Sequence, residues 1–263
     1  MKNHIIVISI GVFGLGFPFQ QTQGFDELDP VYKVFRSNNA EATLIVASAD
    51  GKIEKVFNQE RSLIRFSPAS TFKILNTLIA LKLTPISSAE SLFKWDGKVR
   101  QNLAWNKNHT LNSAFKVSCV WCYQSIAREI GVSKYAEELN AAAYGNRHVS
   151  APVDLFWLNG VVKISASEQI DFLRRLVNNT LPYKLSDTQV LKEIMLVDKN
   201  SDYALYAKSG WTGPELETGW YVGYIETSND TFVFAMNMRM SAAKQAPLRK
   251  KLVIESLQAL KLI

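Results

Sequence analysis

The 263-residue chain has little of the side-chain chemistry that metal and redox enzymes use. It contains only two cysteines and three histidines, and no His-x-His or His-Glu-x-x-His motif occurs. A catalytic zinc site needs several nitrogen, sulfur or oxygen ligands at characteristic spacings, so none is expected. We accordingly predict neither a metal nor a bound cofactor.

Long runs of charge and low-complexity tracts are also absent. The 30 basic and 24 acidic residues leave a formal net charge of +6, and the longest basic run is Arg249-Lys250-Lys251. Binding of nucleic acid usually needs a concentrated basic patch, so no nucleic-acid partner is expected. A mild positive field instead favours an anionic small molecule. With 47% hydrophobic residues, the chain is not disordered, collagen-like or a coiled coil.

The only long apolar stretch lies at the start of the chain. Lys2 precedes an apolar block from Ile5 to Phe19, and a polar and acidic segment follows. This layout is typical of a secretory signal peptide, and the block is shorter than the ~20 residues of a membrane span. We therefore predict a signal peptide over 1–24, with an uncertain cleavage site, and one exported periplasmic domain over 25–263. Without an Ala-x-Ala cleavage site, an uncleaved anchor is the alternative.

The two cysteines stand three positions apart, as Cys119 and Cys122. In an oxidising compartment they could form a disulfide or a redox motif. We favour two small apolar residues packed in a helix, because no thioredoxin-like strand precedes them. His109 and His148 have no evident partner, and both are expected at the surface.

Hydrophobic periodicity predicts strands near both ends of the chain and helices in the middle. The predicted strands are 42–46, 53–57, 203–207, 220–225 and 231–238, and the predicted helices are 67–83, 114–130, 134–142, 167–178 and 247–260. These elements indicate an α/β (α+β) fold. Its antiparallel sheet is built from both ends of the chain and flanked by N- and C-terminal helices, with an all-helical region over about 65–196 inserted.

The strongest chemical signal lies at the start of the helix predicted over 67–83. Ser67 and Pro68 suit the N-cap and first position of a helix, and Ser70 and Lys73 then share one face. The following turns are apolar nearly all round, which is typical of a buried helix. Burial disfavours a lysine ammonium, so Lys73 could act as a base toward a nucleophilic Ser70.

The Ser-x-x-Lys pattern by itself is weak evidence for catalysis. A helix-start serine with a lysine that reaches solvent would look the same. The pattern also recurs three times elsewhere, starting at Ser91, Ser113 and Ser241.

Four further motifs follow the first in a fixed order. The five are Ser70-Thr71-Phe72-Lys73, Ser118-Cys119-Val120, Tyr144-Gly145-Asn146, Phe156-Trp157-Leu158 and Lys208-Ser209-Gly210. Together they resemble the class D, oxacillinase-type (OXA) serine β-lactamases, from near residue 40 to the C-terminus. Relative to the Ser-x-x-Lys, Ser-Asp-Asn and Lys-Thr-Gly signature of class A enzymes and penicillin-binding proteins, Ser118-Cys119-Val120 and Ser209 are departures.

The resemblance implies a serine β-lactamase of the penicillin-binding transpeptidase-like fold. It would hydrolyse penicillins and oxacillin-type compounds through an acyl-enzyme on Ser70, and so confer antibiotic resistance. Carbon dioxide or bicarbonate would carboxylate Lys73 to give the general base. Val120 would keep that group dry, and Trp157 would donate its indole N–H to it. The alternative for Trp157 is an ordinary core aromatic.

The remaining site residues are also implied by the resemblance. Ser118 and Lys208 would relay a proton to the leaving nitrogen. Substrate contacts would come from Ser209, from Arg249 toward the substrate carboxylate, from Tyr144 beside the pocket, and from the backbone of Trp211, which shares an oxyanion hole with Ser70. Trp105 is a further candidate for the pocket wall. A solvated basic face is the alternative for Arg249, and a plain helix connection is the alternative for Tyr144.

Two related functions stay open at this point. A β-lactam sensor domain would be acylated in the same way but would release the acyl group slowly, and a penicillin-binding DD-peptidase would act on cell-wall peptides. For the predicted β-lactamase, the expected partner is a small-molecule β-lactam substrate. The sequence does not distinguish a monomer from a homodimer, and it does not reveal activity on carbapenems.

Overall fold

The computed structural model describes residues 23–24 and 29–263. Almost all of the predicted signal peptide lies outside these residues, so it stays a prediction. Within the described part of the chain, no helix is long and apolar enough to cross a membrane.

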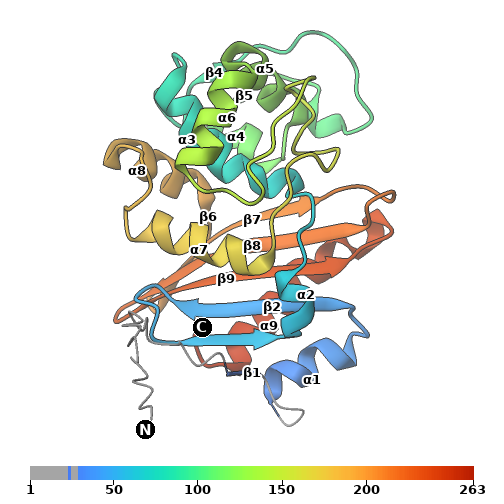
Figure 1. Ribbon diagram of the computed structural model, residues 1–263, viewed down its shortest axis with the longest axis vertical. Coiled ribbons are helices and arrows are strands. Elements are labelled where there is room, and N and C mark those ends of the chain that lie inside the picture. The colour runs from blue at the N-terminus through green and yellow to red at the C-terminus, as the bar shows by residue number, and fades with distance from the viewer. Residues whose placement is uncertain (1–22, 25–28) are drawn as a thin grey trace, which may run out of the picture.

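In the described part of the chain, a seven-stranded sheet lies at the centre, in the order β1-β3-β2-β9-β8-β7-β6 (Figure 1). Every pairing is antiparallel except that of β1 with β3. The strands are β1 (Gln23–Gly24), β2 (Ala42–Ser48), β3 (Glu54–Phe57), β6 (Leu196–Lys199), β7 (Tyr203–Trp211), β8 (Thr218–Thr227) and β9 (Thr231–Arg239). The pairing of β2 with β9 joins the two ends of the chain, which confirms the predicted architecture.

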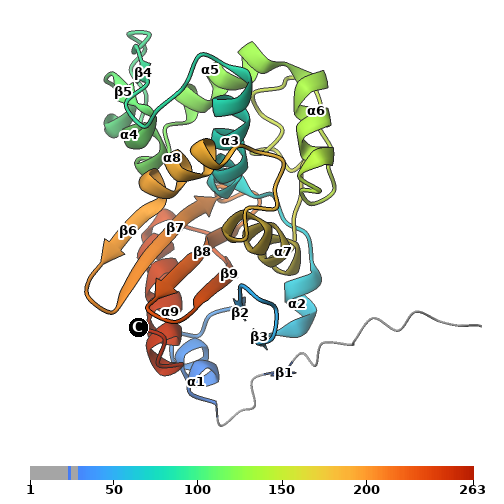
Figure 2. The ribbon, with the colours of Figure 1, turned by 90° about the vertical axis from the view of Figure 1, so that its left-hand side faces the viewer.

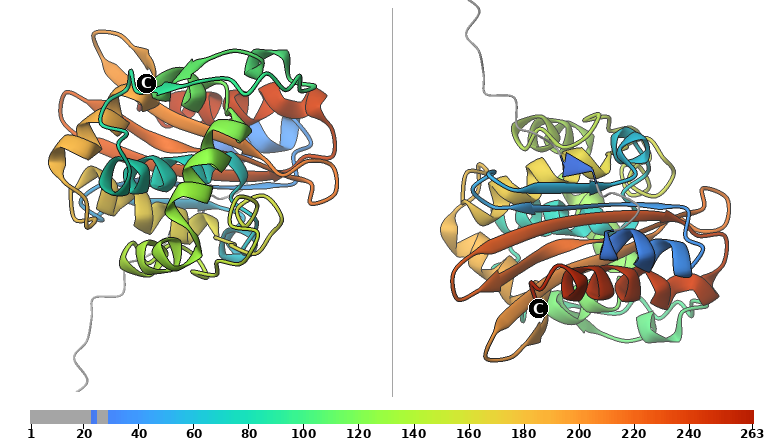
Figure 3. Two further views of the ribbon diagram at one scale, coloured as in Figure 1. Left: turned by 90° about the horizontal axis from the view of Figure 1, so that it is seen from above. Right: turned by 90° about the horizontal axis from the view of Figure 1, so that it is seen from below.

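The N- and C-terminal helices lie together on one face of this sheet (Figure 3). They are α1 (Pro30–Ser37) and α9 (Ala246–Ala259). Asp29 caps α1, since its carboxylate accepts a hydrogen bond from the Val31 N–H at 2.8 Å. Both helices bury apolar side chains in one cluster with the sheet, Phe35 and Leu252 among them. The predicted helix flanks are therefore confirmed.

The inserted region stands over the opposite face (Figure 2). Helix α2 (Gln59–Leu63) precedes this region. The helices of the region are α3 (Lys73–Leu83), α4 (Leu111–Lys116), α5 (Val120–Ile130), α6 (Val132–Ala141), α7 (Ala166–Val177) and α8 (Leu185–Met195), and its 3₁₀ turns are η1 (Ala69–Phe72) and η2 (Leu103–Trp105). A third 3₁₀ turn, η3 (Ala243–Gln245), precedes α9. The region is not purely helical, because β4 (Leu92–Phe93) pairs with β5 (His109–Thr110). A second apolar cluster joins this region to the sheet.

Two predicted helices differ from the structure in ways that shape the site. The helix expected over 114–130 is broken into α4 and α5 at Ser118, whose φ of 54° lies in the left-handed region. The helix expected over 67–83 begins later, as η1 followed by α3. Ser67 does not cap it, because its hydroxyl donates to the Trp157 carbonyl at 2.9 Å.

Strand β7 is longer than predicted and ends at Trp211 rather than at 207. Lysine and glycine are weak strand formers, so local propensity ended the prediction early. Pairing with β8 extends the strand, since Lys208 lies opposite Val222 and Gly210 opposite Trp220. The Lys208-Ser209-Gly210 motif is thus part of a rigid strand.

Candidate active site

Ser70 lies in η1, and Lys73 is the first residue of α3, which follows directly. Their Oγ and Nζ atoms are 3.3 Å apart. Ser70 keeps 9% of its surface exposed, whereas Lys73 is fully buried. Burial, and secondarily the charge of Lys208, lowers the pKa of Lys73 well below its ordinary value. The predicted buried amine beside the serine is therefore present.

Ser118 and Lys208 form a second pair of polar groups. The Lys208 ammonium donates to Ser118 Oγ at 2.6 Å and to the Ser209 carbonyl at 3.1 Å. Burial, with a smaller contribution from Arg249, lowers the pKa of Lys208 to about 7. Near neutral pH this lysine can therefore hold or release a proton, and the serine hydroxyl is the group to which it would pass.

The end of β7 lies against the turn that carries Ser70. A Cβ added to Gly210 would come within 3.0 Å of the Pro68 carbonyl and 3.3 Å of the Ser70 nitrogen. Only glycine permits so close an approach of the two backbones. The strand therefore brings the backbone of Trp211 and the side chain of Lys208 to the nucleophile.

Arg249 reaches the same strand from helix α9. Its Nη1 donates to the Gly210 carbonyl and its Nε to the Ala246 carbonyl at 3.1 Å. Burial lowers the pKa of this guanidinium. Its neighbours Lys250 and Lys251 are exposed, so Arg249 is not part of the solvated basic face that was the alternative. Ser209 and Trp211 are half-buried in β7.

Trp157 is fully buried, and its indole N–H has no hydrogen-bond partner in the described structure. Its ring stacks on Phe72 with centroids 5.7 Å apart, and its carbonyl accepts from the Ala69 N–H at 3.1 Å. Buried donors usually have an acceptor, so this indole N–H is available to a group bound near it. Val120, the first residue of α5, is half-buried.

Tyr144 does not border an open pocket, and this prediction is wrong. The residue is fully buried, and its ring packs edge-to-face on Phe72 and Phe172. Its hydroxyl accepts from Gln169 Nε2 at 3.5 Å. The apolar rings around it offer more burial than a position at a cleft, so the tyrosine is a core residue.

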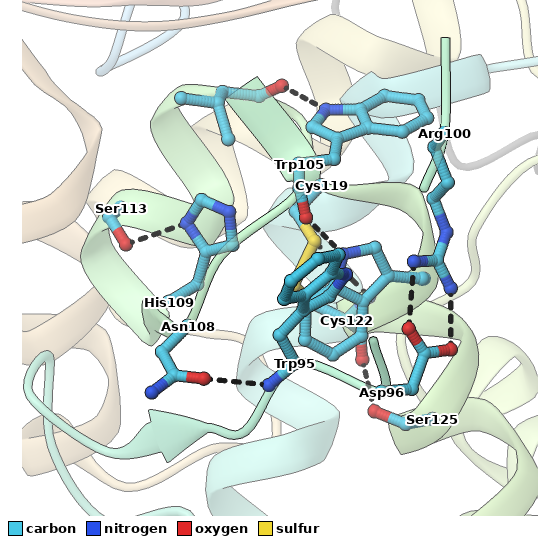
Figure 4. The surroundings of a disulfide bond; sticks show 12 residues. Trp95, Asp96, Arg100, Trp105, Asn108, His109, Ser113, Cys119, Cys122 and Ser125 are labelled. Carbon is cyan, nitrogen blue, oxygen red and sulfur yellow. Dashed lines mark hydrogen bonds and ion pairs between the residues drawn. A yellow bond between two sulfur atoms is a disulfide. The ribbon is translucent and has the colours of Figure 1, made fainter. Parts of the chain in front are cut away.

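The two cysteines form a disulfide, with Cα atoms 5.5 Å apart (Figure 4). The interpretation as two packed free cysteines was therefore wrong, although both residues are buried as expected. His109 is also misplaced by the prediction, because only 1% of it is exposed and its Nδ1 lies 3.0 Å from Ser113 Oγ. Trp105, the other pocket candidate, is half-buried, and its indole N–H donates to the Val117 carbonyl at 3.0 Å.

Sequence reasoning missed several buried residues that support the site. Gln169 Nε2 donates to Thr71 Oγ1 at 3.1 Å, and the Trp220 indole donates to the Ser67 carbonyl at 2.9 Å. Lys73 Nζ lies 4.8 Å from the ring centroid of Tyr123. No local pattern identifies these residues, because each meets the Ser70 turn from a distant part of the chain.

Comparisons with known proteins agree on one family. Residues 34–257 match the model of the penicillin binding protein transpeptidase domain. The chain is 42% identical over 207 residues to β-lactamase OXA-48 of Klebsiella pneumoniae, covering 78% of each, and 36% identical over 234 residues to β-lactamase OXA-20 of Pseudomonas aeruginosa, covering 87% of each.

Solved structures give the same result. The class D β-lactamase YbXI from Nostoc superposes with a TM-score of 0.86 at 33% identity, covering 89% of this chain and 99% of that one. FUS-1 (OXA-85), a class D β-lactamase from Fusobacterium nucleatum subsp. polymorphum, superposes with a TM-score of 0.85 at 35% identity, covering 89% and 98%.

Proposed function

The chain belongs to the class D serine β-lactamases, and on that premise we propose how its own residues open a β-lactam ring and release the product. The observation that carries the proposal is the fully buried Lys73 amine, 3.3 Å from the Ser70 hydroxyl. A neutral amine at that distance is a base within reach of the nucleophile's proton.

In the first half of the reaction, Ser70 Oγ attacks the lactam carbonyl carbon and its proton passes toward Lys73. The carbonyl oxygen becomes an oxyanion, which the N–H groups of Ser70 and Trp211 would bind. Each such donor typically contributes a factor of ~100 to ~1,000 in rate. Because Gly210 lets β7 approach the Ser70 turn so closely, the two N–H groups are held on rigid backbone.

The ring C–N bond then breaks, and the leaving nitrogen takes up a proton. Ser118 would deliver it from Lys208, whose Nζ lies 2.6 Å from the serine oxygen. A lysine with a pKa of about 7 is suited to this step, because it can lose and regain a proton at neutral pH. Arg249 and Ser209 would bind the carboxylate that β-lactams carry.

We propose that carbon dioxide adds to the neutral amine of Lys73, which forms an N–C bond and releases one proton. The residues present fit such a group. Lys73 lies in an apolar, fully buried setting that favours the unprotonated amine, and Trp157 supplies an indole donor without a partner. The carboxylate would supply a general base for the release of the acyl group as well as for its formation.

The proposed substrates are penicillins and oxacillin-type β-lactams, and the proposed location is the periplasm, reached through the predicted signal peptide. OXA-type relatives support resistance to β-lactams as the biological outcome.

Turnover of a chromogenic cephalosporin by the purified protein, with and without added bicarbonate, tests this function. We expect rapid turnover that bicarbonate increases, with only a transient acyl adduct by intact-mass measurement. A long-lived adduct without turnover would indicate a sensor instead. Absence of any adduct on Ser70 would refute both. Lys73→Ala should abolish turnover, and undiminished hydrolysis by this variant would exclude the lysine from the reaction.

A further inference from the structure

The Cys119–Cys122 disulfide closes the turn directly after Ser118. The two cysteines are three positions apart and fully buried. The entropic stabilisation that a disulfide gives grows with the length of the loop it closes. A disulfide that closes such a short loop therefore contributes little to the stability of the whole fold. The effect of this bond must be mainly local.

The bond lies where helix α5 lacks an ordinary cap. Helices usually begin at Ser, Thr, Asp or Asn, whose oxygen accepts a backbone N–H of the first turn. Helix α4 follows this rule, since Thr110 and Ser113 form a capping box. The N-cap of α5 is instead Cys119, whose sulfur accepts from the Cys122 N–H at 3.3 Å. Sulfur is a weak acceptor, so the covalent bond between the same two residues fixes the first turn.

The geometry of this turn decides where the Ser118 hydroxyl points. The left-handed backbone of Ser118 is uncommon for a residue other than glycine. Its N–H donates to the Phe115 carbonyl at 3.1 Å, and the next N–H, that of Cys119, donates to the Ala114 carbonyl at 2.8 Å. The conformation brings Ser118 Oγ to Lys208, so relaxation of the turn would move the hydroxyl away from that lysine.

The same turn also fixes the segment around Trp105. The Trp121 indole, between the two cysteines, donates to the Trp105 carbonyl at 2.8 Å. The Trp105 indole in turn donates to the Val117 carbonyl at 3.0 Å, directly before Ser118. Figure 4 shows these hydrogen bonds around the disulfide.

We propose that the Cys119–Cys122 disulfide is a positioning element of the active site. It holds Ser118 Oγ against Lys208 and, through Trp121, holds the Trp105 segment beside it. The inference rests on the proposed function, in which Ser118 passes a proton to the leaving nitrogen.

The test compares two double variants in steady-state kinetics and thermal unfolding. Cys119→Ala with Cys122→Ala removes the bond and any cap, and we expect kcat to fall by about 10-fold, as small misplacements of a reacting group do. Cys119→Ser with Cys122→Ala removes the bond but restores an oxygen cap, so its kcat should lie between that of the alanine pair and that of the wild type. KM should rise in both, because the Trp105 segment is less fixed.

Ile126→Ala is the matched control. Ile126 is buried on the same helix, one turn beyond Cys122, and its side chain belongs to the apolar cluster that joins the inserted region to the sheet. It should lower Tm and leave kcat unchanged. If the alanine pair also loses Tm without losing kcat, the disulfide has only a structural role and the inference is wrong.

Ser118→Ala separates this inference from the proposed function. Loss of kcat in Ser118→Ala, with wild-type kcat in the alanine pair, would overturn the disulfide inference alone. Wild-type kcat in Ser118→Ala would overturn the proton relay itself. If the alanine pair does not fold, the serine pair decides, with reduced kcat supporting the inference and wild-type kcat opposing it.

Discussion

Replacing Trp157 by phenylalanine tests whether its unpaired indole donor is reserved for a carboxylated Lys73. Among the residues that the structure describes, none accepts a hydrogen bond from this indole N–H, so removing it breaks no hydrogen bond within that part of the protein. In the carboxylated protein it would donate to a carboxylate. Hydrogen bonds to charged groups contribute about 1.5–3 kcal/mol, and about 1.4 kcal/mol corresponds to a tenfold change in an equilibrium constant. The equilibrium constant for carboxylation of Lys73 should therefore fall by about 10-fold to 100-fold in this variant.

The assay follows the modification directly as well as through turnover. Titration with ¹³C-labelled bicarbonate, read by the NMR signal of a lysine carbamate, gives the midpoint of carboxylation, and kcat is measured over the same range. Trp157→Phe should shift both midpoints to higher bicarbonate, and saturating bicarbonate should recover much of the lost kcat.

Trp220→Phe is the matched control for this substitution. Trp220 is equally buried, but its indole N–H already donates to the Ser67 carbonyl at 2.9 Å. The control loses similar volume and should lower Tm while leaving the bicarbonate midpoint unchanged. Equal midpoints for Trp157→Phe and the wild type would refute the reasoning, because the indole would then have no preference for the modified lysine.

Three further predictions concern other parts of the site. The pKa of Lys73 lies well below 10.5, so the unfolded chain binds a proton on this amine more strongly than the folded chain does. In bicarbonate-free buffer the free energy of unfolding should therefore rise with pH between the lowered pKa and 10.5. Lys73→Met should raise Tm at neutral pH, with a gain that shrinks toward pH 10.5; a constant gain would contradict this. Arg249→Ala removes a positive charge that lowers the pKa of Lys208, so the limb of the kcat/KM profile near pH 7 should move to higher pH, and an unmoved limb would assign it to another group. Gly210→Ala adds a methyl group that forces β7 away from the Ser70 turn, and it should slow acylation, measured by stopped-flow, by about 10-fold or more. The control is Gly213→Ala, because Gly213 has open space around it but a φ of 87°, so this substitution should alter local stability rather than acylation.

The sequence predicted well those parts of the fold that depend on local pattern. Alternating apolar residues identified the strands at both ends, and the Ser70 and Lys73 pair was placed correctly because helical spacing and apolar surroundings are both visible in the chain. The roles of Ser118 and Lys208 were predicted from the family resemblance of the motifs that they begin. Nothing local shows that they meet, because their contact joins residues 90 positions apart.

The errors share one physical cause, which is that tertiary contacts override local preference. Ser67 has the composition of a helix cap, but its hydroxyl bonds to the Trp157 carbonyl instead. Tyr144 is predicted from the family resemblance to border the pocket, but its ring packs on the rings of Phe72 and Phe172 instead. The disulfide could not be decided from the sequence, because its formation depends on a helix break at Ser118 that the periodicity concealed.

The pairing of β2 with β9 has a consequence for the order in which the molecule is made. Ile45 lies opposite Ala235, so β2 cannot pair with β9 until the chain has been synthesised beyond residue 235. Ser70 is synthesised long before Lys208 and Gly210, which complete its surroundings. A nascent chain therefore carries Ser70 and Lys73 before Lys208, Gly210 and Arg249 have been made, and the site is complete only when β7 and α9 are in place.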